Sequence, residues 1–293
     1  MGALTEHRVA VPLRVPLAGM GAVDAVLLEG PSGWGEWSAS PPGYAADPAA
    51  GRRAAEEAAC GTWPAAVRPR VAVNALVPAV GPATAASVAA EAVAAGAGCV
   101  KVKVGDLHDT GRVAAVRDAV GPRVRLRLDA NGAWDVETAV SFLGRLARYD
   151  LELVEQPVAS LDDLARVRRR LPVPVAADEC VRSTDDARRL RALDAADAVV
   201  VKVQPLGGVA AAIEVAEAAG VPAIVSSLYE TSVGLAAGLA LAAALPELPY
   251  ACGLGTAALL AGDVVADPLV PVGGELAVRR PVPDPALVAR YAV

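Results

Sequence analysis

Aromatic residues and clusters of basic residues are scarce in this sequence. Aromatic side chains make up 3% of its 293 residues, and phenylalanine occurs once. Nucleic-acid-binding surfaces are typically basic and interleaved with aromatics, whereas this chain has a formal net charge of −6 and no such cluster. The longest apolar run, residues 233–245, is too short to span a bilayer and stops at Pro246. We therefore expect neither a nucleic-acid partner nor a membrane partner.

Cysteine is scarce as well. The four cysteines lie far apart and form no C-x-x-C pair, which argues against a disulfide framework and against a zinc site. The first seven residues lack the charged and apolar regions of a signal peptide. The sequence therefore predicts a cytoplasmic protein whose thiols are reduced.

The sequence is rich in hydrophobic residues (54%), many of them alanine, and from about residue 71 they form a repeating pattern. Short β-branched runs alternate with alanine-rich helical segments, and successive runs start roughly 22–28 residues apart. This alternation predicts parallel βαβ units, and about eight of them predict a closed barrel of the (β/α)8 kind. The last strand and the helix after it are weakly marked, so we expect a modified, (β/α)7β-like barrel. The predicted strands are residues 71–77, 99–104, 124–129, 151–155, 173–178, 198–203, 222–226 and 250–252.

The two ends of the chain differ from this pattern. Residues 8–37 alternate apolar with polar side chains, which predicts a small antiparallel sheet, and a helix is expected around residues 54–60. The last 31 residues carry prolines and two adjacent glycines and are expected to pack on that sheet. We predict an N-terminal α+β capping domain (residues 1–70), a barrel catalytic domain (71–262) and a tail (263–293) that returns to the capping domain.

One charged residue lies at the carboxyl end of each of five consecutive predicted strands. The five are spaced 26, 26, 23 and 24 residues apart. Because the carboxyl ends of parallel barrel strands surround one mouth, where active sites of this architecture lie, we expect these side chains to converge. The two lysines would face each other across the mouth with three carboxylates between them. The residues are Lys103, Asp129, Glu155, Asp178 and Lys202.

The residue types in this row indicate a chemistry. Three converging carboxylates repel one another, and an oxygen-only ligand set suits Mg²⁺ or Mn²⁺ rather than zinc. A metal flanked by lysines is suited to removing a proton next to a carboxylate, because the metal stabilises the enediolate while a neutral lysine accepts the proton. A single charge at a strand end is more often a helix cap or a loop residue. Five in register are not, because caps have no reason to alternate in this way.

Residues 99–105 alternate valine with lysine. In a strand, Val100 and Val102 face one way while Lys101 and Lys103 face the other. Ammonium groups inside a barrel require anionic partners, and the three carboxylates supply them. Lys103, nearer the mouth, is predicted to be the base. Lys101, one layer deeper, is predicted to support it.

These motifs together resemble those of the enolase superfamily, in the branch that carries Lys-x-Lys on the second barrel strand. The resemblance covers the barrel, and the N-terminal sheet resembles the capping domain of that superfamily. It implies a Mg²⁺ ion held by the three carboxylates and two catalytic lysines. The matching motifs are Lys101-Val-Lys103, Asp129-Ala-Asn131, Glu155-Gln-Pro157, Asp178-Glu179 and Lys202-Val-Gln204.

Stretches 73–78, 125–129 and 226–235 resemble one group of dehydratases within this branch. The resemblance implies a small-molecule dicarboxylate substrate that loses water after proton abstraction, driven by formation of an aromatic ring. In such a syn elimination Lys103 serves as base and then as acid. Lys202 would stabilise the intermediate or act as a second acid or base.

Further residues are predicted around this centre. Ser226 and Ser227, followed by the N-terminus of the helix over residues 233–245, offer donors for an anionic group of the substrate, although a plain helix cap would also explain them. Directly after the weak eighth strand, Gly253 and Leu254 are expected to contact substrate.

Arg127 is expected to share the inner barrel face with Asp129. There it would either favour the neutral form of Lys103 by charge repulsion or serve only in packing. Asn131 and Glu179 are predicted to support the metal ligands or the lysines. No physical reason for a cysteine at position 180 is evident from the sequence.

Several other functions are compatible with the same residues. Within the branch, an N-succinylamino acid racemase also uses two opposed lysines, and a muconate-type cycloisomerase shares the motifs. A Schiff-base aldolase would use Lys103 or Lys202 but leaves the carboxylates unexplained, and a non-catalytic binding barrel would bind no divalent metal. The absence of a carboxylate in the eighth strand argues against dipeptide epimerases. The sequence leaves the oligomeric state open, and a monomer is compatible with it.

Overall fold

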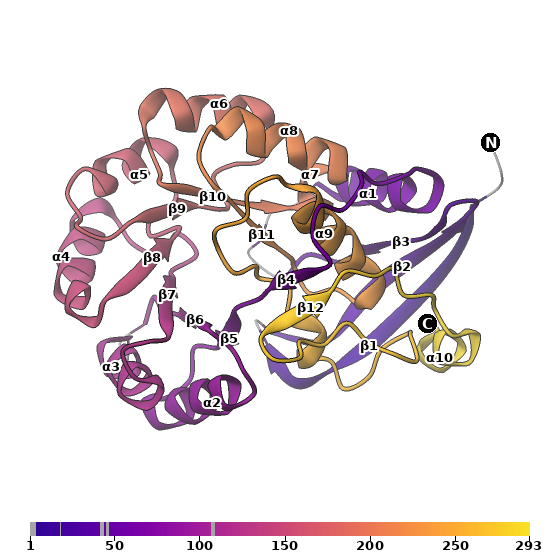
Figure 1. The fold of residues 1–293 in the computed structure, drawn as a ribbon, viewed down its shortest axis with the longest axis horizontal. Coiled ribbons are helices and arrows are strands. Elements are labelled where there is room, and N and C mark those ends of the chain that lie inside the picture. Colours follow the sequence, from indigo (N-terminus) through magenta and orange to yellow (C-terminus); the bar gives the residue numbers. More distant parts are fainter. Residues whose placement is uncertain (1–3, 18, 42–43, 45–46, 107–108) are drawn as a thin grey trace.

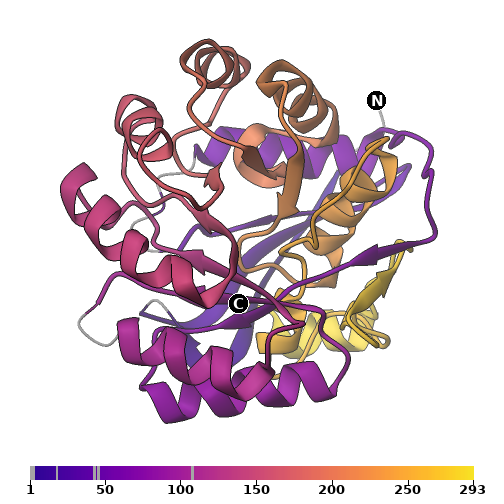
Figure 2. The same ribbon diagram turned by 60° about the vertical axis from the view of Figure 1, so that its left-hand side comes forward.

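The computed structural model describes residues 4–17, 19–41, 44, 47–106 and 109–293. A curved parallel sheet surrounded by helices forms one part of the molecule, and an antiparallel sheet with the two chain ends forms the other (Figures 1 and 2). In the described ranges no helix is long and apolar enough to cross a membrane.

Seven parallel strands follow one another around the barrel in the order in which they occur in the chain. They are β5 (Ala75–Val77), β6 (Cys99–Lys103), β7 (Arg125–Asp129), β8 (Leu151–Glu155), β9 (Val175–Ala177), β10 (Ala198–Lys202) and β11 (Ala223–Ser226). The predicted α/β barrel is therefore confirmed. The predicted first strand is divided, because its first half, β4 (Arg70–Ala72), pairs elsewhere.

The expected eighth strand is present only as two isolated bridges. Cys252 bridges Val73 and Gly253 bridges Ser226, both in parallel register, so these contacts join β11 to the start of the barrel. A regular strand is not formed over residues 250–252. Glycines at positions 253 and 255 weaken strand pairing there, since glycine offers no side chain to pack and loses much backbone entropy.

Helices cover the outside of the barrel (Figure 1). Val100 and Val102 of β6 are fully buried in the same apolar cluster as Ala89 and Val113 of the covering helices, so the valine face of that strand is the packed face. The helices are α2 (Pro82–Ala94), α3 (Asp109–Val120), α4 (Val136–Leu146), α5 (Leu161–Arg168), α6 (Thr184–Leu193), α7 (Val203–Leu206), α8 (Val209–Ala219) and α9 (Ser232–Ala244). Short 3₁₀ turns lie at Ala147–Tyr149 and Thr256–Leu259.

The N-terminal region forms the predicted antiparallel sheet, β1 (Thr5–Leu17), β2 (Met20–Gly30) and β3 (Gly33–Ser38), followed by α1 (Pro48–Cys60). The tail runs back to this region. Its strand β12 (Glu275–Ala277) pairs with β4, and its helix α10 (Pro285–Tyr291) packs near β1, where Val9 bridges Ala292. The shared apolar cluster contains Val11, Leu27 and Val288.

Two glutamates join the capping region to the barrel by capping its helices. Glu36 of β3 accepts hydrogen bonds from the backbone N–H groups of Thr231 (2.9 Å) and Gly234 (2.8 Å) at the start of α9. Glu57 of α1 does the same at the start of α8, accepting from Val209 (2.5 Å) and Ala210 (3.0 Å). A carboxylate at a helix N-terminus satisfies free N–H groups and complements the helix dipole. These contacts orient the capping sheet relative to the mouth.

Candidate active site

The structure brings the five predicted strand-end residues together at one end of the barrel. Lys103, Asp129, Glu155 and Lys202 are the last residues of β6, β7, β8 and β10, and Asp178 directly follows β9. The strand register aligns Lys103 with Asp129 and Asp129 with Glu155. The two lysines lie on strands separated by the three carboxylate-bearing strands.

Lys103 is the most accessible ammonium group of the site. Its side chain is 25% exposed, compared with 10% for Lys101 and 9% for Lys202. Its Nζ donates to Asp129 Oδ2 at 2.6 Å and to Asn131 Oδ1 at 2.7 Å. Lys103 can therefore reach a molecule entering the mouth, while the other two lysines lie deeper.

Lys101 lies one layer below and is shared between two carboxylates. Its Nζ is 2.9 Å from Asp129 Oδ2 and 2.8 Å from Glu155 Oε1. Burial alone would lower the pKa of Lys101, but the two carboxylates outweigh it and hold the pKa above its ordinary value. Lys101 is therefore a fixed positive charge between Asp129 and Glu155.

Lys202 is paired with Asp178 and covered by a tyrosine of the capping region. Its Nζ donates to both oxygens of Asp178, at 2.7 and 2.6 Å. The ring of Tyr44 lies 4.6 Å from Nζ, a cation–π distance. Burial opposes the charge on Lys202, but Asp178 and its neighbours raise the pKa of this lysine well above its ordinary value. Burial also raises the pKa of Tyr44 to about 12. No pattern in the sequence pointed to a role for this tyrosine.

The three buried carboxylates respond differently to the same surroundings. Burial disfavours the ionised form of Asp129, but the ammonium groups of Lys101 and Lys103 hold its pKa well below the usual range. For Glu155, burial and the negative charge of Asp129 prevail and raise the pKa to about 7. The pKa of Asp178 is also raised, chiefly by burial. Burial therefore makes the ionised forms of Glu155 and Asp178 costly even with the three lysines nearby.

This donor set fits a divalent cation in its chemistry. Asp129, Glu155 and Asp178 offer only oxygen ligands, are 1–3% exposed and destabilise one another when ionised. As arranged here, each carboxylate is hydrogen bonded to a lysine. Within the described ranges, no group of three or more His, Cys, Asp or Glu side chains is gathered closely enough to hold a metal ion.

Two supporting residues predicted from the sequence contact each other. Asn131 Nδ2 donates to Glu179 Oε1 at 2.8 Å, while Asn131 Oδ1 accepts from Lys103. Asn131 has a positive φ of 45°, which turns the chain back toward the mouth directly after Asp129. Glu179 thus acts on Lys103 through Asn131.

Gln156, the middle residue of the Glu155-Gln-Pro157 motif, organises the loop carrying Asp178. This residue is fully buried with φ 40°. Its Oε1 accepts from the backbone N–H of Asp178 at 2.7 Å and lies 3.2 Å from Cys180 Sγ. The thiol therefore contributes a weak donor to Gln156, which explains a small polarisable residue at position 180.

The contacts of Arg127 do not involve Lys103, the lysine whose neutral form it was expected to favour in one of the two interpretations. It is fully buried, its Nε donates to Glu152 Oε2 (2.5 Å) and its Nη1 donates to the carbonyl of Ala251 (2.7 Å). The guanidinium also lies 5.4 Å from the ring centre of Tyr250. These contacts favour the packing alternative over an electrostatic influence on Lys103.

Contact between the N-terminus of α9 and an anionic part of the substrate stays a prediction, and the structure shows other partners for these N–H groups. Two carboxylates of the chain already occupy it: Glu36 binds the N–H groups of Thr231 and Gly234, and Asp263 accepts from the N–H of Ser232. Glu36 is 3% exposed and Asp263 5% exposed. A third anion would meet two buried negative charges there.

The predicted substrate-binding residues divide into two groups. The hydroxyls of Ser226 and Ser227 both point to the carbonyl of Gly253, at 3.4 and 3.0 Å, so they hold the bridge that closes the barrel. Ser227 and Gly253 remain partly exposed at the mouth. Contact with substrate stays a prediction for Leu254, which is fully buried in the apolar core. It belongs to the barrel wall.

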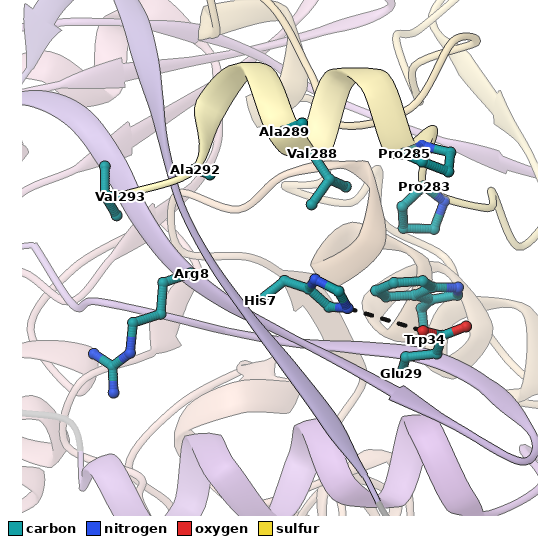
Figure 3. A pocket seen from close by; sticks show the side chains of 10 residues that line it. All are labelled: His7, Arg8, Glu29, Trp34, Pro283, Pro285, Val288, Ala289, Ala292 and Val293. Atoms are coloured by element: carbon teal, nitrogen blue, oxygen red, sulfur yellow. Dashed lines mark ion pairs between the residues drawn. The ribbon is translucent and has the colours of Figure 1, made fainter.

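A separate pocket of about 500 Å³ lies between the capping sheet and α10 (Figure 3). His7, Glu29 and Trp34 form its floor, and Pro283 and Val288 are among the residues of the opposite wall. The imidazole stacks against the indole at 5.2 Å between ring centres. None of the strand-end residues lines this pocket, so it belongs to the seam between sheet and tail.

Comparison with known proteins agrees with this geometry. The chain matches the family model described as enolase C-terminal domain-like over residues 84–284 and the model described as enolase N-terminal domain-like over residues 8–59. The chain belongs to the enolase superfamily. Among curated relatives, the o-succinylbenzoate synthase of Thermobifida fusca (strain YX) is 54% identical over 282 residues, covering 94% of this chain and 88% of the relative. The o-succinylbenzoate synthase of Mycolicibacterium smegmatis (strain ATCC 700084 / mc(2)155) is 46% identical over 98% of this chain and 89% of the relative.

Solved structures share the fold at lower identity. The N-succinyl Arg/Lys racemase from Bacillus cereus ATCC 14579 superposes with a TM-score of 0.87 at 20% identity, over 99% of this chain and 97% of the other. The 2-chloromuconate cycloisomerase from Rhodococcus opacus 1CP gives 0.88 at 24% identity, over 99% of both chains. Neighbours this distant establish the capped-barrel architecture and do not distinguish between activities.

Proposed function

We propose that this chain is an o-succinylbenzoate synthase. It would dehydrate 2-succinyl-6-hydroxy-2,4-cyclohexadiene-1-carboxylate (SHCHC), a small dicarboxylate, to o-succinylbenzoate in menaquinone biosynthesis. The observation that carries the proposal is the row of buried carboxylates with Lys103 on one side and Lys202 on the other, in a chain 54% identical to an o-succinylbenzoate synthase. Proton abstraction next to a carboxylate needs a base at the mouth and positive charge to stabilise the enediolate.

Lys103 is proposed as the base that removes the proton next to the ring carboxylate. Its exposure and its position at the strand end support this role, and Asn131 and Asp129 hold its Nζ in place. After the proton is transferred, the ammonium of Lys103 can return a proton to the departing hydroxyl on the same face. The loss of water then leaves an aromatic ring.

Lys202 is proposed to stabilise the enediolate as a fixed cation. Its raised pKa keeps it charged, because Asp178 binds it through both oxygens. Lys101 is proposed to keep Asp129 and Glu155 in position below the substrate. A protonated Lys202 also argues against an aldolase that forms an imine there, since an imine requires a neutral amine.

Superfamily members generally use Mg²⁺, and we propose Asp129, Glu155 and Asp178 as its ligands in this chain, with Mn²⁺ as a substitute. When bound, the cation would neutralise the three carboxylates and polarise the carboxylate of the substrate. The raised pKa of Glu155 supports this assignment, because burial and, after it, the negative charge of Asp129 disfavour the ionised carboxylate, and a cation there would stabilise it.

The organisation proposed for the chain is a capping domain over residues 1–70, a barrel over 71–262 and a tail over 263–293. The oligomeric state stays open, and a monomer is compatible with the sequence. A cytoplasmic location is supported by the four cysteines, which are all free thiols.

The test is a side-by-side assay of one enzyme preparation. Loss of SHCHC absorbance in the ultraviolet with Mg²⁺ present would be compared with racemisation of an N-succinyl amino acid. We expect turnover of SHCHC at least as efficient as racemisation. Racemisation with no dehydration would replace the proposal by the N-succinylamino acid racemase alternative.

A further inference from the structure

Arg112 of α3 is a fully enclosed arginine connected to the strand that carries Lys103. Its side chain is 1% exposed. Its Nε donates to the carbonyl of Val80 at 2.6 Å, and its Nη1 donates to the carbonyl of Lys103 at 2.9 Å. The same guanidinium pairs with Asp109 (2.8 Å) and Asp106 (2.6 Å). One side chain therefore joins the loop after β5, the end of β6 and the start of α3.

The carbonyl of Lys103 needs such a donor because its neighbouring strand is too short. The N–H of Val104 donates to the carbonyl of Asp129 on β7, at 2.9 Å. Since the polar groups of successive residues in a parallel strand point to opposite neighbours, the carbonyl of Lys103 faces β5. That strand ends at Val77, which pairs with Val102. On the β5 side Lys103 therefore has no paired residue, although Asp129 of β7 pairs with it on the other side.

Arg112 takes the place of the missing ladder partner. Its planar guanidinium reaches the carbonyls of Val80 and Lys103 together and so links the two strand ends that β5 no longer links. Asp109 extends the arrangement by accepting from the N–H groups of Gly105 (2.7 Å) and Asp106 (2.9 Å) in the turn that follows Lys103. The main chain is thus held both at Lys103 and immediately after it.

We propose that Arg112 is a positioning residue for the proton transfer, which fixes the main chain from which the Lys103 side chain extends. The inference rests on the proposed role of Lys103 as the base. A lysine carries its ammonium on a flexible four-carbon stem, so the position of Nζ depends on where the stem begins. A displacement of about 1 Å at a reacting group can cost about 10²-fold in rate.

The same helix supplies a matched control. Arg117 is also an α3 arginine that serves main-chain carbonyls, those of Tyr149, Gly121, Val124 and Asp150, at 2.7–3.1 Å. These carbonyls lie at the other end of α3 and in the loop before β7 and β8, away from the mouth. Loss of its hydrogen bonds should therefore affect stability without moving Lys103.

The experiment compares Arg112→Lys with Arg117→Lys in the full chain with Mg²⁺. Lysine keeps the positive charge but cannot reproduce the fork that binds two carbonyls at once. For Arg112→Lys we expect kcat to fall at least about tenfold with KM within about twofold, because a misplaced base weakens the chemical step and not substrate binding. For Arg117→Lys we expect a similar loss of Tm with kcat within about twofold of wild type. Equal kcat values in the two variants, or an effect of Arg112→Lys confined to KM or Tm, would overturn the proposal.

Two further variants complete the test. If Arg112→Lys does not fold, Asp109→Asn loosens the same guanidinium while keeping an acceptor for the turn, and an unchanged kcat in that variant overturns the proposal. Lys103→Ala is assayed in parallel. Activity retained in Lys103→Ala removes the proposed base and the inference with it, whereas an inactive Lys103→Ala beside a fully active Arg112→Lys overturns the inference alone.

Discussion

The barrel interior contains two groups of buried charged side chains, and the two groups differ in how their members contact one another. The upper group, at the mouth, consists of three lysines and three carboxylates: Lys101, Lys103, Lys202, Asp129, Glu155 and Asp178. The lower group consists of Arg127 and Glu152, beneath the ring of Tyr250. Both groups lie on the inner face of neighbouring strands, and a single residue, Leu128, separates Arg127 from Asp129 along β7. Burial alone therefore does not distinguish a reactive site from a structural one.

The difference lies in how many arrangements each group can adopt. The guanidinium of Arg127 is planar and is bound by a carboxylate, a main-chain carbonyl and an aromatic face, so it has one arrangement. The lysines are point charges on long stems, and they share carboxylate partners. Asp129, for example, pairs with both Lys101 and Lys103. Proton transfer and cation binding both require charged groups that can exchange one partner for another. The lower group should therefore serve stability and the upper group chemistry.

Removal of either lysine proposed to be catalytic tests the upper group most strongly. Lys103→Ala and Lys202→Ala should each lower kcat by about 10³-fold or more, because general acid–base and electrostatic contributions of this size are lost. Far-ultraviolet circular dichroism should remain that of the wild type. Near-wild-type turnover of SHCHC in either variant would contradict the assignment of the upper group.

Loss of one proposed metal ligand should come next in size. Asp178→Asn should lower Mg²⁺-dependent turnover by about 10²-fold, and calorimetry should show weaker Mg²⁺ binding. Exhaustive chelation of the wild type should abolish activity, and added Mg²⁺ or Mn²⁺ should restore it. Full activity after chelation would contradict a metal in the upper group.

Arg127→Met, in the lower group, should have the opposite effect: a loss of stability with activity nearly unchanged. It leaves Glu152 and the carbonyl of Ala251 without their buried partner, so the free energy of unfolding should fall by about 3–5 kcal/mol. The value of kcat should stay within about threefold of wild type. Denaturant unfolding and steady-state kinetics on the same sample measure both quantities. A large loss of kcat with unchanged stability would show that the two groups are not separate.

The smallest expected effect on turnover concerns Glu230, a buried carboxyl beside the mouth that accepts a hydrogen bond from the N–H of Leu228. Burial and the nearby charge of Glu36 raise its pKa to about 8. Between its ordinary value of 4.5 and about 8, the folded state keeps a proton that the unfolded chain has released. Stability from this group is therefore complete below pH 4.5 and is lost as the pH rises through 8, at most about 1.4 kcal/mol per pH unit.

Glu230→Gln should flatten that part of the stability profile, because the amide does not titrate. Unfolding measured from pH 5 to pH 9 in both proteins provides the comparison. Parallel profiles for wild type and Glu230→Gln would show that this carboxyl is ionised in the folded protein throughout the range.

The site was predictable where its residues follow the strand period. Lys103, Asp129 and Glu155 each end a strand, and consecutive strands are neighbours in the barrel, so their meeting follows from spacing alone. Glu152 was not predictable as the partner of Arg127. It is the additional residue where the register of β8 shifts against β7, so the alternation that assigns side chains to faces fails there.

Long-range contacts account for what the local pattern did not indicate. The N-terminus of α9 was predicted to receive an anion, and the structure places Glu36, 195 residues before Thr231, and Asp263, 31 residues after Ser232, on its N–H groups. Leu254 lies in a segment whose strand character is weak, so alternation gave no guidance about which way its side chain points. Arg112 could not be recognised either, since its role depends on β5 being too short to pair with Lys103.

The sequence by itself determined the capped α/β barrel and the row of lysines and carboxylates around its mouth. Both follow from a local repeat, because each strand and helix bring the next charged residue to the same end of the sheet. Only the tertiary structure decided which lysine faces which carboxylate, how single bridges close the barrel and which carboxylates cap α8 and α9. Those contacts join residues distant in the chain, and their partners are selected by packing geometry that no local pattern encodes.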